Sequence, residues 1–458
     1  MPTVMGLYKA ERIAPIVDEF LAAEASFAWL QIGDSNLTQN SGGYGYTRRI
    51  TIGQIAKRPQ IASHNCTAGV FTGDNISYSS DGNTSDFLPD TLRASSQGDQ
   101  WQNADYSHAQ VSAVLKPFLP TTAAMRAVDL FVPAMPEPGD QLGTVHYRLL
   151  HDETDIYDYN FEEAHKIWIA YPKESSLGSV AWQVRATTGP TNIVNGTLDQ
   201  SPVGAPTGTA EITVEVLATR TAGQNSWNNG ENIQFMPYAN LTTPGITTPG
   251  SPELGPFTMV LSIFATWPDR GHGYLVAPLI ADGGGSLGEY VLALADANNA
   301  WTDWKLIAAC AAMEGRRSYV IVEIQHGLND NTNEATFLTR LTTAAEHLLA
   351  RFDALKAAGS IPSTVIDIRI LYSGCIHRIP AATEDLSYCY NAARTLADSN
   401  SRVCVADFRT LMTEAEFGVI GDGTAHLTSD ANYLMHDRRW VTRFFTACRL
   451  ARSLREAA

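Results

Sequence analysis

The spacing of hydrophobic residues changes along the chain, and it predicts two kinds of structure. Residues 10–24 carry apolar side chains at helical spacing, and the apolar run 27–32 that follows has the length of a short buried strand. From about residue 288, helical and strand-like patterns alternate again up to the C-terminus. Such alternation is typical of a parallel sheet with helices on both faces. The two ends of the chain are therefore expected to form one α/β domain.

In the C-terminal segment, stretches with helical spacing alternate regularly with short strand-like apolar runs. Gly359 directly follows a long amphipathic stretch and is expected to end that helix, because glycine favours the backbone conformation found past helix ends. The predicted helices cover about 288–313, 334–358, 386–397 and 437 onward, and the predicted strands cover 319–324, 365–372 and 402–408.

The middle third of the chain lacks helical periodicity and contains short β-rich runs. Connections rich in Gly, Pro, Thr and Ser separate these runs, which is typical of an antiparallel sandwich. We therefore predict a β-sandwich inserted at roughly 95–272, so that the α/β domain comprises residues 1–94 and 273–458. The runs that predict strands are 127–132, 145–150, 166–171, 180–185, 212–217 and 257–264.

Length and composition narrow the classes of partner. The 458 residues exceed what one hydrophobic core usually serves, and 44% of them are apolar, which is enough for packed cores. The formal net charge is -16 and no basic run of five or more residues occurs, so nucleic acid is a poor partner. Neither a membrane span nor a signal peptide is visible. The sequence does not decide the cellular compartment, and an extracellular or periplasmic location remains an alternative.

The cysteines and histidines lack the spacing of a metal site. The six cysteines include no Cys-x-x-Cys pair, and no two of the 11 histidines have the helical His-x-x-x-His spacing. We expect mostly free, buried thiols, with a local disulfide such as Cys375 to Cys389 as the alternative in an oxidising compartment. No metal and no cofactor are expected.

A hydroxyl nucleophile is predicted where the first buried strand ends. Ser35, in the sequence Gly-Asp-Ser-Asn, directly follows the run 27–32, and open α/β sheets place their chemistry at this end of their strands. A serine hydroxyl becomes nucleophilic beside a base that removes its proton. Asp422 and His426 lie four residues apart in a glycine-containing turn. One loop can therefore supply both the base and the carboxylate that orients it.

An acyl-transfer site also needs fixed hydrogen-bond donors for the oxyanion. The candidates are the backbone N–H of Ser35, the backbone N–H of Gly285 and the side-chain amide of Asn329. Asn329, in the sequence Gly-Leu-Asn-Asp, follows the predicted strand 319–324, and Gly285 closes a run of three glycines. Ser, Asn, Asp and His residues thus supply the groups that a serine hydrolase needs, and they come in that order along the chain, so the sequence is interpreted as that of a serine esterase.

These residues resemble the sequence blocks of the GDSL or SGNH hydrolases, a family named after such Ser, Gly, Asn and His residues. The resemblance covers residues 25–40 and 275–450. The sequence around Ser35 is similar to the first block, the glycine turn at Gly285 (with Gly284 as the alternative) to the second, Gly-Leu-Asn-Asp at Asn329 to the third, and the stretch from Asp422 to Leu427 to the last.

The resemblance implies a fold and a mechanism. The fold would be a three-layer α/β/α, flavodoxin-like domain with a parallel sheet, and the activity that of a serine esterase forming an acyl-enzyme without a cofactor. Ser35 would attack, His426 would take its proton, and Asp422 would orient His426. Ser35, Gly285 and Asn329 would donate to the oxyanion.

The chain departs from the family pattern in two places. The family usually spaces its Asp and His by three residues, whereas Asp422 and His426 are four apart, which leaves His436 beside Asp437 as an alternative base. The insertion of roughly 180 residues is longer than simple members carry. Some members that act on carbohydrates hold an accessory β-domain, and this is the basis for expecting a carbohydrate ester.

A second serine competes as the nucleophile. Ser286, in Gly-Gly-Ser-Leu-Gly, matches the Gly-x-Ser-x-Gly elbow of α/β-hydrolases and precedes a predicted helix. No His-Gly-Gly segment precedes it, and the Asn329 motif would then have no role. Each motif alone also fits an ordinary turn or helix cap. His326, beside the Asn329 turn, either lines the cleft or makes a structural hydrogen bond.

The function expected from the sequence is removal of a small acyl group, first of all acetyl, from a saccharide. Lipid, aryl or thioester substrates are the alternatives within the enzyme class. The expected partner is an acylated small molecule or a polysaccharide, with no nucleic acid and no membrane span. Trp168, Trp182 and Trp227 could stack on sugar rings, although core packing is the default for the first two. A glycan-binding or surface-attachment protein with a weak or dead site is the alternative from another class.

Overall fold

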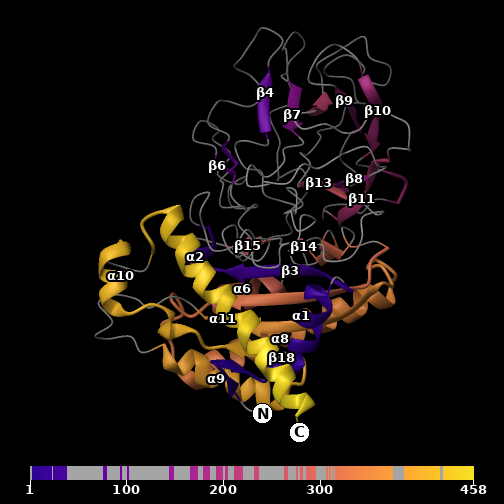
Figure 1. Ribbon diagram of the computed structural model, residues 1–458. Helices are drawn as coiled ribbons and strands as arrows, with labels where there is room; N and C mark the ends of the chain where they lie inside the picture. The colour runs from indigo at the N-terminus through magenta and orange to yellow at the C-terminus, as the bar shows by residue number, and fades with distance from the viewer. Residues whose placement is uncertain are drawn as a thin grey trace.

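The computed structural model describes much of the two ends of the chain, and the middle mainly as separate strands. Described are residues 3–22, 24–38, 285–295, 315–374, 386–422 and 426–457, short stretches near 310 and, between 76 and 281, strands and a turn at 202–204. Eight described strands form the main sheet (Figure 1). In spatial order they are β1 (Thr3–Val4), β2 (Leu7–Tyr8), β18 (Val403–Ala406), β17 (Val365–Tyr372), β16 (Ser318–Gln325), β3 (Ser26–Gly33) and β14 (Leu275–Val276), with β15 (Leu279–Ala281) also beside β3.

The main sheet is mixed and mostly parallel. β3 runs parallel to β14, β15 and β16, and β17 and β18 continue the parallel part. β1 and β2 form an antiparallel edge on β18. The α/β class is confirmed, and the expected parallel sheet is present with one antiparallel addition at this edge. Met5 and Gly6 have φ angles of 51° and 92°, and this tight turn lets a short antiparallel hairpin cover the edge strand.

The helices named here all lie in the two end segments of the described chain. Thr413 and Glu416 form a reciprocal capping box that begins α10, an element that the hydrophobic pattern does not predict. The helices are η1 (Ala10–Arg12), α1 (Ala14–Leu21), α2 (Ser35–Thr38), α6 (Leu287–Ala295), α8 (Glu334–Ala357), α9 (Ser387–Ser399), η3 (Arg409–Leu411), α10 (Glu414–Ile420) and α11 (Asp430–Glu456).

Helices cover both faces of the main sheet. On one face, α1 and α11 pack on β3, and the rings of Trp29 and Trp440 lie 6.2 Å apart. On the other face, α8 and α9 pack on β17, and the ring of Phe337 lies 5.9 Å from that of Tyr372. Figure 1 shows α11 crossing in front of the sheet along its length. The buried β3 and β16, apolar on both faces at most positions, explain why the sequence reads as continuous apolar runs.

Several predicted elements are confirmed within a residue or two. The helix expected at 334–358 is α8, and Gly359 after it has a φ of 76°, as expected for a helix-ending glycine. The strand expected at 365–372 is β17, and those at 27–32 and 319–324 are β3 and β16, each one residue longer at both ends. The helix at 386–397 and the strand at 402–408 correspond to α9 and β18.

The prediction for the last helix is wrong at its start. α11 begins at Asp430, not near 437, because the side chain of Ser429 caps it by accepting from the N–H of Asn432. The helix expected at 10–24 is also shorter, since η1 precedes α1 and Pro15 stands in the first turn of α1. The helix expected at 288–313 is present as α6 up to Ala295, and residues 296–305 lie outside the described residues.

The described strands of the middle segment pair mostly in antiparallel fashion. Most strand predictions there correspond to a described strand, whereas 127–132 lies outside the described residues. One sheet contains, in order, β10 (Asn192–Asp199), β9 (Ser179–Arg185), β12 (Asn232–Met236), β7 (Thr144–Arg148) and β4 (Ile76–Ser79). A second sheet contains β11 (Glu211–Thr219), β8 (Lys166–Lys173) and β13 (Ser262–Thr266). A third contains β5 (Arg93–Ala94) and β6 (Trp101–Gln102).

The strand β4 precedes residue 94, yet it pairs with β7 of the middle segment. The domain boundaries at 94 and 272, and the sandwich arrangement, stay predictions. Trp168 lies in β8 and Trp182 in β9, as expected, but nothing further is described of their side chains, and Trp227 lies outside the described residues.

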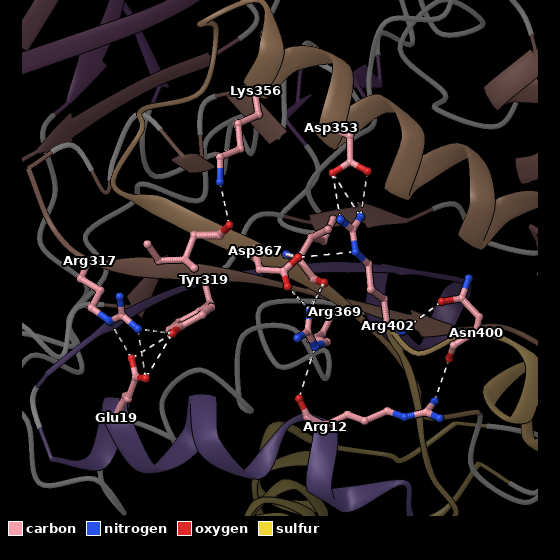
Figure 2. A network of polar contacts seen from close by, with 12 residues as sticks. Arg12, Glu19, Arg317, Tyr319, Asp353, Lys356, Asp367, Arg369, Asn400 and Arg402 are labelled. Carbon is pink, nitrogen blue, oxygen red and sulfur yellow. Dashed lines mark hydrogen bonds and ion pairs between the residues drawn. The ribbon is translucent and has the colours of Figure 1, made fainter.

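Polar contacts tie the elements together at the edge where the parallel strands begin (Figure 2). The guanidinium of Arg12 donates to the carbonyls of Ala397, Asn400 and Val403 over 2.6, 2.7 and 2.8 Å. Arg402 contacts both carboxylate oxygens of Asp353. These contacts join η1, α8, α9 and β18, so this edge is fastened by side chains from distant parts of the chain.

The described cysteines are free and buried, as expected for most of the thiols. They are Cys310, Cys389, Cys404 and Cys448, so the alternative disulfide of Cys375 with Cys389 does not form here. Burial raises the pKa of both the Cys389 and the Cys404 thiols to about 12. No helix among the described residues is long and apolar enough to cross a membrane.

Candidate active site

Three of the sequence motifs leave the main sheet side by side. Gly33, the last residue of β3, pairs with Ala281 of β15 on one side and with Gln325 of β16 on the other. The residues that follow these three strands therefore emerge at one edge of the sheet. In α/β folds this carboxyl edge is where ligands bind.

The Gly-Asp-Ser-Asn motif forms a tight turn from β3 into α2. A Cβ on Gly33 would lie 2.8 Å from the carbonyl oxygen of Gln325 and 2.5 Å from Leu37, so only glycine lets the strands approach this closely. Asp34 is fully buried, and its carboxylate accepts from the backbone N–H of Asn36 over 3.0 Å. The glycine and the aspartate thus have local structural roles that fix the turn.

Ser35 is the first residue of α2. The N–H groups of a first helical turn have no partner inside the helix, so the N–H of Ser35 is suited to donate to a bound anion. The side chain of Ser35 lies outside the described residues. Its place in the fold is thus known from the backbone alone, directly after β3.

The second and third motifs contact each other. The side-chain amide of Asn329 donates to the carbonyl oxygen of Gly285 over 3.2 Å, while Gly285 itself is buried. An amide nitrogen carries two hydrogens, so the second one is available for another acceptor. Two of the three expected oxyanion donors, Gly285 and Asn329, thus lie in contact, next to the strand that leads to Ser35. The alternative, Gly284, lies outside the described residues.

The turn that carries Asn329 is shaped by its glycine. Gly327 has a φ of 137°, which side-chain-bearing residues rarely adopt, and a Cβ there would lie 2.9 Å from the sulfur of Cys389. The hydroxyl of Tyr372 donates to the carbonyl of His326 over 2.8 Å and holds the start of the turn. The glycine of the third motif is therefore required by close packing on α9.

Asp422 and His426 face each other across a closed turn. Nδ1 of His426 lies 3.0 Å from Oδ2 of Asp422, and the backbone N–H of His426 donates to Oδ1 of the same carboxylate over 3.1 Å. The N–H of Asp422 in turn donates to the carbonyl of His426 over 2.8 Å. The four-residue spacing therefore still brings the carboxylate to the imidazole.

A small hydrophobic cluster fastens this turn to α2. Leu37, two residues after Ser35, and Leu427, next to His426, belong to one buried cluster. Its other members come from α10, α11 and the segment before α10 and are Met412, Phe417 and Tyr433. The segments carrying Ser35 and His426 therefore contribute side chains to the same small core.

Tyr433 joins the same segments through its polar end. Its ring is buried in the cluster, and burial raises the pKa of its phenol well above the usual range. The carboxylates of Asp422 and Asp34 lie close enough to raise it further, and the backbone of Leu427 hydrogen-bonds to the hydroxyl. Tyr433 therefore contacts the histidine turn and shares a core with the segment that follows the Gly-Asp-Ser-Asn motif, a role that sequence reasoning missed.

The alternative base, His436, lies inside α11. Its side chain is 9% exposed, and its Nδ1 is 3.7 Å from Oδ1 of the fully buried Asp437. The side chain of His426 is 22% exposed and closer to its carboxylate. A base must reach both a substrate and solvent, so the geometry favours His426.

The competing nucleophile, Ser286, caps a helix. Its hydroxyl lies 3.0 Å from Oε2 of Glu289, which also accepts from the N–H of Ser286 over 2.7 Å. The N–H of Glu289 donates back to the Ser286 hydroxyl over 3.2 Å. This reciprocal capping box at the start of α6 accounts for the serine without catalysis.

His326 lies beneath the surface of the site. It is fully buried, and its ring stacks near that of Tyr290 with centroids 6.2 Å apart. Burial lowers the pKa of its imidazole, while the carboxylates of Asp34, Asp330 and Glu289 partly oppose this effect. Of the two roles expected for His326, the structural one fits its burial.

Compared with models of known protein families and with curated proteins, the chain gives no match. Within the described part of the chain, no group of three or more His, Cys, Asp or Glu side chains is arranged to hold a metal ion. The candidate site is therefore defined by the geometry described above. Gly285 and Asn329 are in contact, and an imidazole–carboxylate pair lies in a turn that shares a small core with the segment of Ser35.

Proposed function

We propose that this chain is a serine carboxylesterase of the GDSL or SGNH type. The observation that carries the proposal is the shared cluster of Leu37 and Leu427, which joins the helix beginning at Ser35 to the turn of Asp422 and His426. The contact between Asn329 and Gly285 at the neighbouring strand ends supports it further. A nucleophile, a base with its carboxylate and oxyanion donors are the parts such an enzyme needs.

In the proposed reaction, Oγ of Ser35 attacks the ester carbonyl carbon while its proton passes to His426. Since Nδ1 of His426 lies 3.0 Å from Asp422, Nε2 is the nitrogen assigned to the serine. The bond from the carbonyl carbon to the alcohol oxygen then breaks, and the alcohol leaves with the proton from His426. A water molecule, deprotonated by the same histidine, attacks the acyl-enzyme, releases the acid and restores Ser35.

The tetrahedral intermediate carries a negative oxygen that the site must stabilise. Its proposed donors are the N–H groups of Ser35 and Gly285 and the amide of Asn329. Asn329 is held by its second contact, to the Gly285 carbonyl, and a donor that is already oriented does not have to be reorganised during the reaction. The flavodoxin-like, SGNH-type form of the fold belongs to this same proposal.

The proposed substrate is an acetyl ester of a saccharide. It is supported by the β-rich middle segment, which we interpret as an inserted β-sandwich, and by the resemblance to carbohydrate-active members of the family. Lipid, aryl and thioester substrates are the alternatives. The glycan-binding alternative relied on the unusual spacing of Asp422 and His426, and their contact weakens that argument.

The test is acid release from p-nitrophenyl acetate and from acetylated xylan by wild type, Ser35→Ala and Ser286→Ala at equal folded concentration. Ser35→Ala should lose more than about a thousandfold in rate, because the nucleophile is gone. Ser286→Ala should stay within a few-fold of wild type and lose about 1 kcal/mol of stability, the usual effect of a lost helix cap.

Each other result has a defined meaning. Loss of activity only in Ser286→Ala would move the nucleophile to the elbow motif before α6. A wild type that is silent on both esters would overturn the esterase proposal for these substrates and favour the glycan-binding alternative. Activity on the aryl ester alone would retain the mechanism and reject the saccharide substrate.

A further inference from the structure

Asp330, next to the expected oxyanion donor Asn329, is a buried carboxylate with backbone partners. Its side chain is 0% exposed. Its Oδ2 accepts from the N–H of Leu287 over 3.1 Å, and its Oδ1 accepts from the N–H of Gly288 over 3.4 Å. The carboxylate therefore caps α6 from outside, from the turn after β16, and holds the residues that directly follow the Gly285 turn.

Arg340 of α8 completes the arrangement. Its guanidinium Nη1 donates to Oδ1 of Asp330 over 3.0 Å, while its own side chain is 33% exposed. The flat guanidinium lies directly over Gly288, where a Cβ would come within 2.8 Å of Cζ of Arg340. The last glycine of the elbow-like motif is thus explained by the close approach of an arginine, not by a nucleophile turn.

Asn329 and Asp330 together grip the Gly285 turn on two sides. Asn329 bonds to the carbonyl of Gly285, and Asp330 bonds to the N–H groups two and three residues further on. Adjacent side chains of one turn thus fix both ends of a short backbone segment. A shift of Arg340 or Asp330 would move Gly285 relative to Asn329, and so separate the two donors.

The arginine also has an electrostatic effect. A buried carboxylate adjacent to Asn329 would repel the negative oxygen that forms in the reaction, and this repulsion is strong where water is excluded. The positive charge 3.0 Å from Asp330 offsets it. The pair can therefore hold the turn without opposing the oxyanion.

We propose that Arg340 and Asp330 are positioning residues that hold Gly285 and Asn329 in the geometry of an oxyanion hole and keep the neighbouring carboxylate neutralised. The inference rests on the proposed esterase function. Neither residue touches the substrate. Their effect is exerted through the Gly285 turn, and it should therefore appear in kcat, where oxyanion stabilisation acts, more than in KM.

The experiment compares Arg340→Met, Asp330→Asn and the double variant on p-nitrophenyl acetate, with Ser35→Ala as the reference for background. Arg340→Met should lower kcat about tenfold with KM within about twofold, because a slightly misplaced group loses less than the roughly hundredfold cost of a 1 Å error. Asp330→Asn should lower kcat roughly threefold, since the amide keeps one acceptor. The double variant should recover to within about threefold of wild type, because no unpaired carboxylate remains.

The matched control is Arg402→Met, which removes another arginine–aspartate pair at the opposite edge of the sheet. Its kcat should equal that of wild type. Thermal unfolding of every variant separates a folding defect from a catalytic one. If Arg340 had only a structural role, changing Asp330 as well would not restore the kcat of Arg340→Met.

The outcomes separate this inference from the proposed function. If the Ser35→Ala variant keeps the activity of wild type, both the proposed function and the positioning inference are overturned. If activity depends on Ser35 but Arg340→Met keeps its kcat within about twofold, the positioning inference alone is wrong. A double variant as slow as Arg340→Met, or slower, would reject the charge effect and with it the proposed role of the pair.

Discussion

The parallel strands of the main sheet begin at one edge of the sheet and end at the opposite edge, and the two carry different polar contacts. We call the edge where the strands begin the first edge and the edge where they end the second edge. At the edge where the parallel strands begin, Arg317 pairs with Glu19 and Arg402 with Asp353, and these side chains are partly exposed (Figure 2). At the edge where the strands end, Asp330 and His326 are buried. Their backbone partners lie at the start of α6, at Leu287 and Gly288, and at Gly285 directly before it. The contacts at the first edge join side chains of distant elements, whereas those at the second edge hold one short backbone segment.

The difference has an energetic side. Exposed ion pairs contribute about 0 to 1 kcal/mol each, so the loss of a single exposed pair at the first edge should be tolerated. A buried polar group that loses its partner costs about 1 to 3 kcal/mol. Among the described residues, side-chain oxygens that are buried without a hydrogen-bond partner occur at both edges, on Asn36, Gln325 and Ser373 at the second and on Thr364 at the first. These unpaired groups therefore do not distinguish the two edges, whereas the ion pairs and the buried carboxylate do.

The largest expected effect separates the two histidines at the second edge. His426→Ala should lower kcat by more than about a thousandfold, because the proposed base is lost while the fold keeps its core. His436→Gln should keep kcat within a few-fold, because its side chain is buried in α11 beside Asp437. Both are measured with p-nitrophenyl acetate at equal folded concentration.

The reverse result would change the assignment of the base. A large loss in His436→Gln with a small one in His426→Ala would make His436 the base and Asp437 its carboxylate. Thermal unfolding is the control, since His436→Gln changes a buried position of α11 and is expected to be the less stable variant.

Much of the sheet could be predicted from the sequence, because its strands are buried on both faces. β3, β16 and β17 are nearly continuous apolar runs, and a run of this kind is visible without knowing its neighbours. The start of α11 could not be found this way. Its first two turns carry many polar residues. The buried residues there, Tyr433, His436 and Asp437, are spaced as on one face of a helix, but two of them are polar, so the apolar pattern does not show this face.

The motifs of the candidate site could be located from the sequence, but not their supports. Glycine, serine and asparagine in turns after strands are visible as a pattern, and Ser35, Gly285 and Asn329 follow from it. Arg340 looks like any polar position of an amphipathic helix. Only the packing of α8 beside α6 brings it over Gly288, and such long-range contacts leave no trace in local spacing.

A smaller effect, on stability and not on rate, is expected at the first edge. Arg12→Ala removes three donor contacts to the carbonyls of Ala397, Asn400 and Val403. It should lower the free energy of unfolding by about 2 kcal/mol and leave kcat unchanged, because charged hydrogen bonds contribute about 1.5 to 3 kcal/mol before solvent replaces part of them. Urea unfolding and the esterase assay check both parts.

Arg317→Met is the matched control for Arg12→Ala. Its ion pair with Glu19 lies at the same edge but is more exposed, so the loss should stay below about 1 kcal/mol. Equal losses in the two variants would show that burial does not decide the strength of these contacts. A fall in kcat for Arg12→Ala would contradict the separation of the two edges.

The smallest expected effect is a pH dependence of stability that comes from His326. Burial lowers the pKa of this imidazole in the folded protein, whereas the unfolded chain binds a proton near the ordinary value of about 6.5. Below that pH the unfolded state carries more protons, so stability is complete above about 6.5 and falls as the pH decreases. Each pH unit in this range costs up to about 1.4 kcal/mol.

His326→Gln removes this titration and keeps a polar side chain of similar size. Urea unfolding of wild type and variant between pH 7.5 and 5 should therefore give curves whose difference shrinks or reverses on the acid side. Other titrating groups contribute to both proteins and cancel in that difference. Parallel curves would mean that His326 binds its proton equally well in the folded state, and the carboxylates of Asp34, Asp330 and Glu289 would then fully offset the effect of burial.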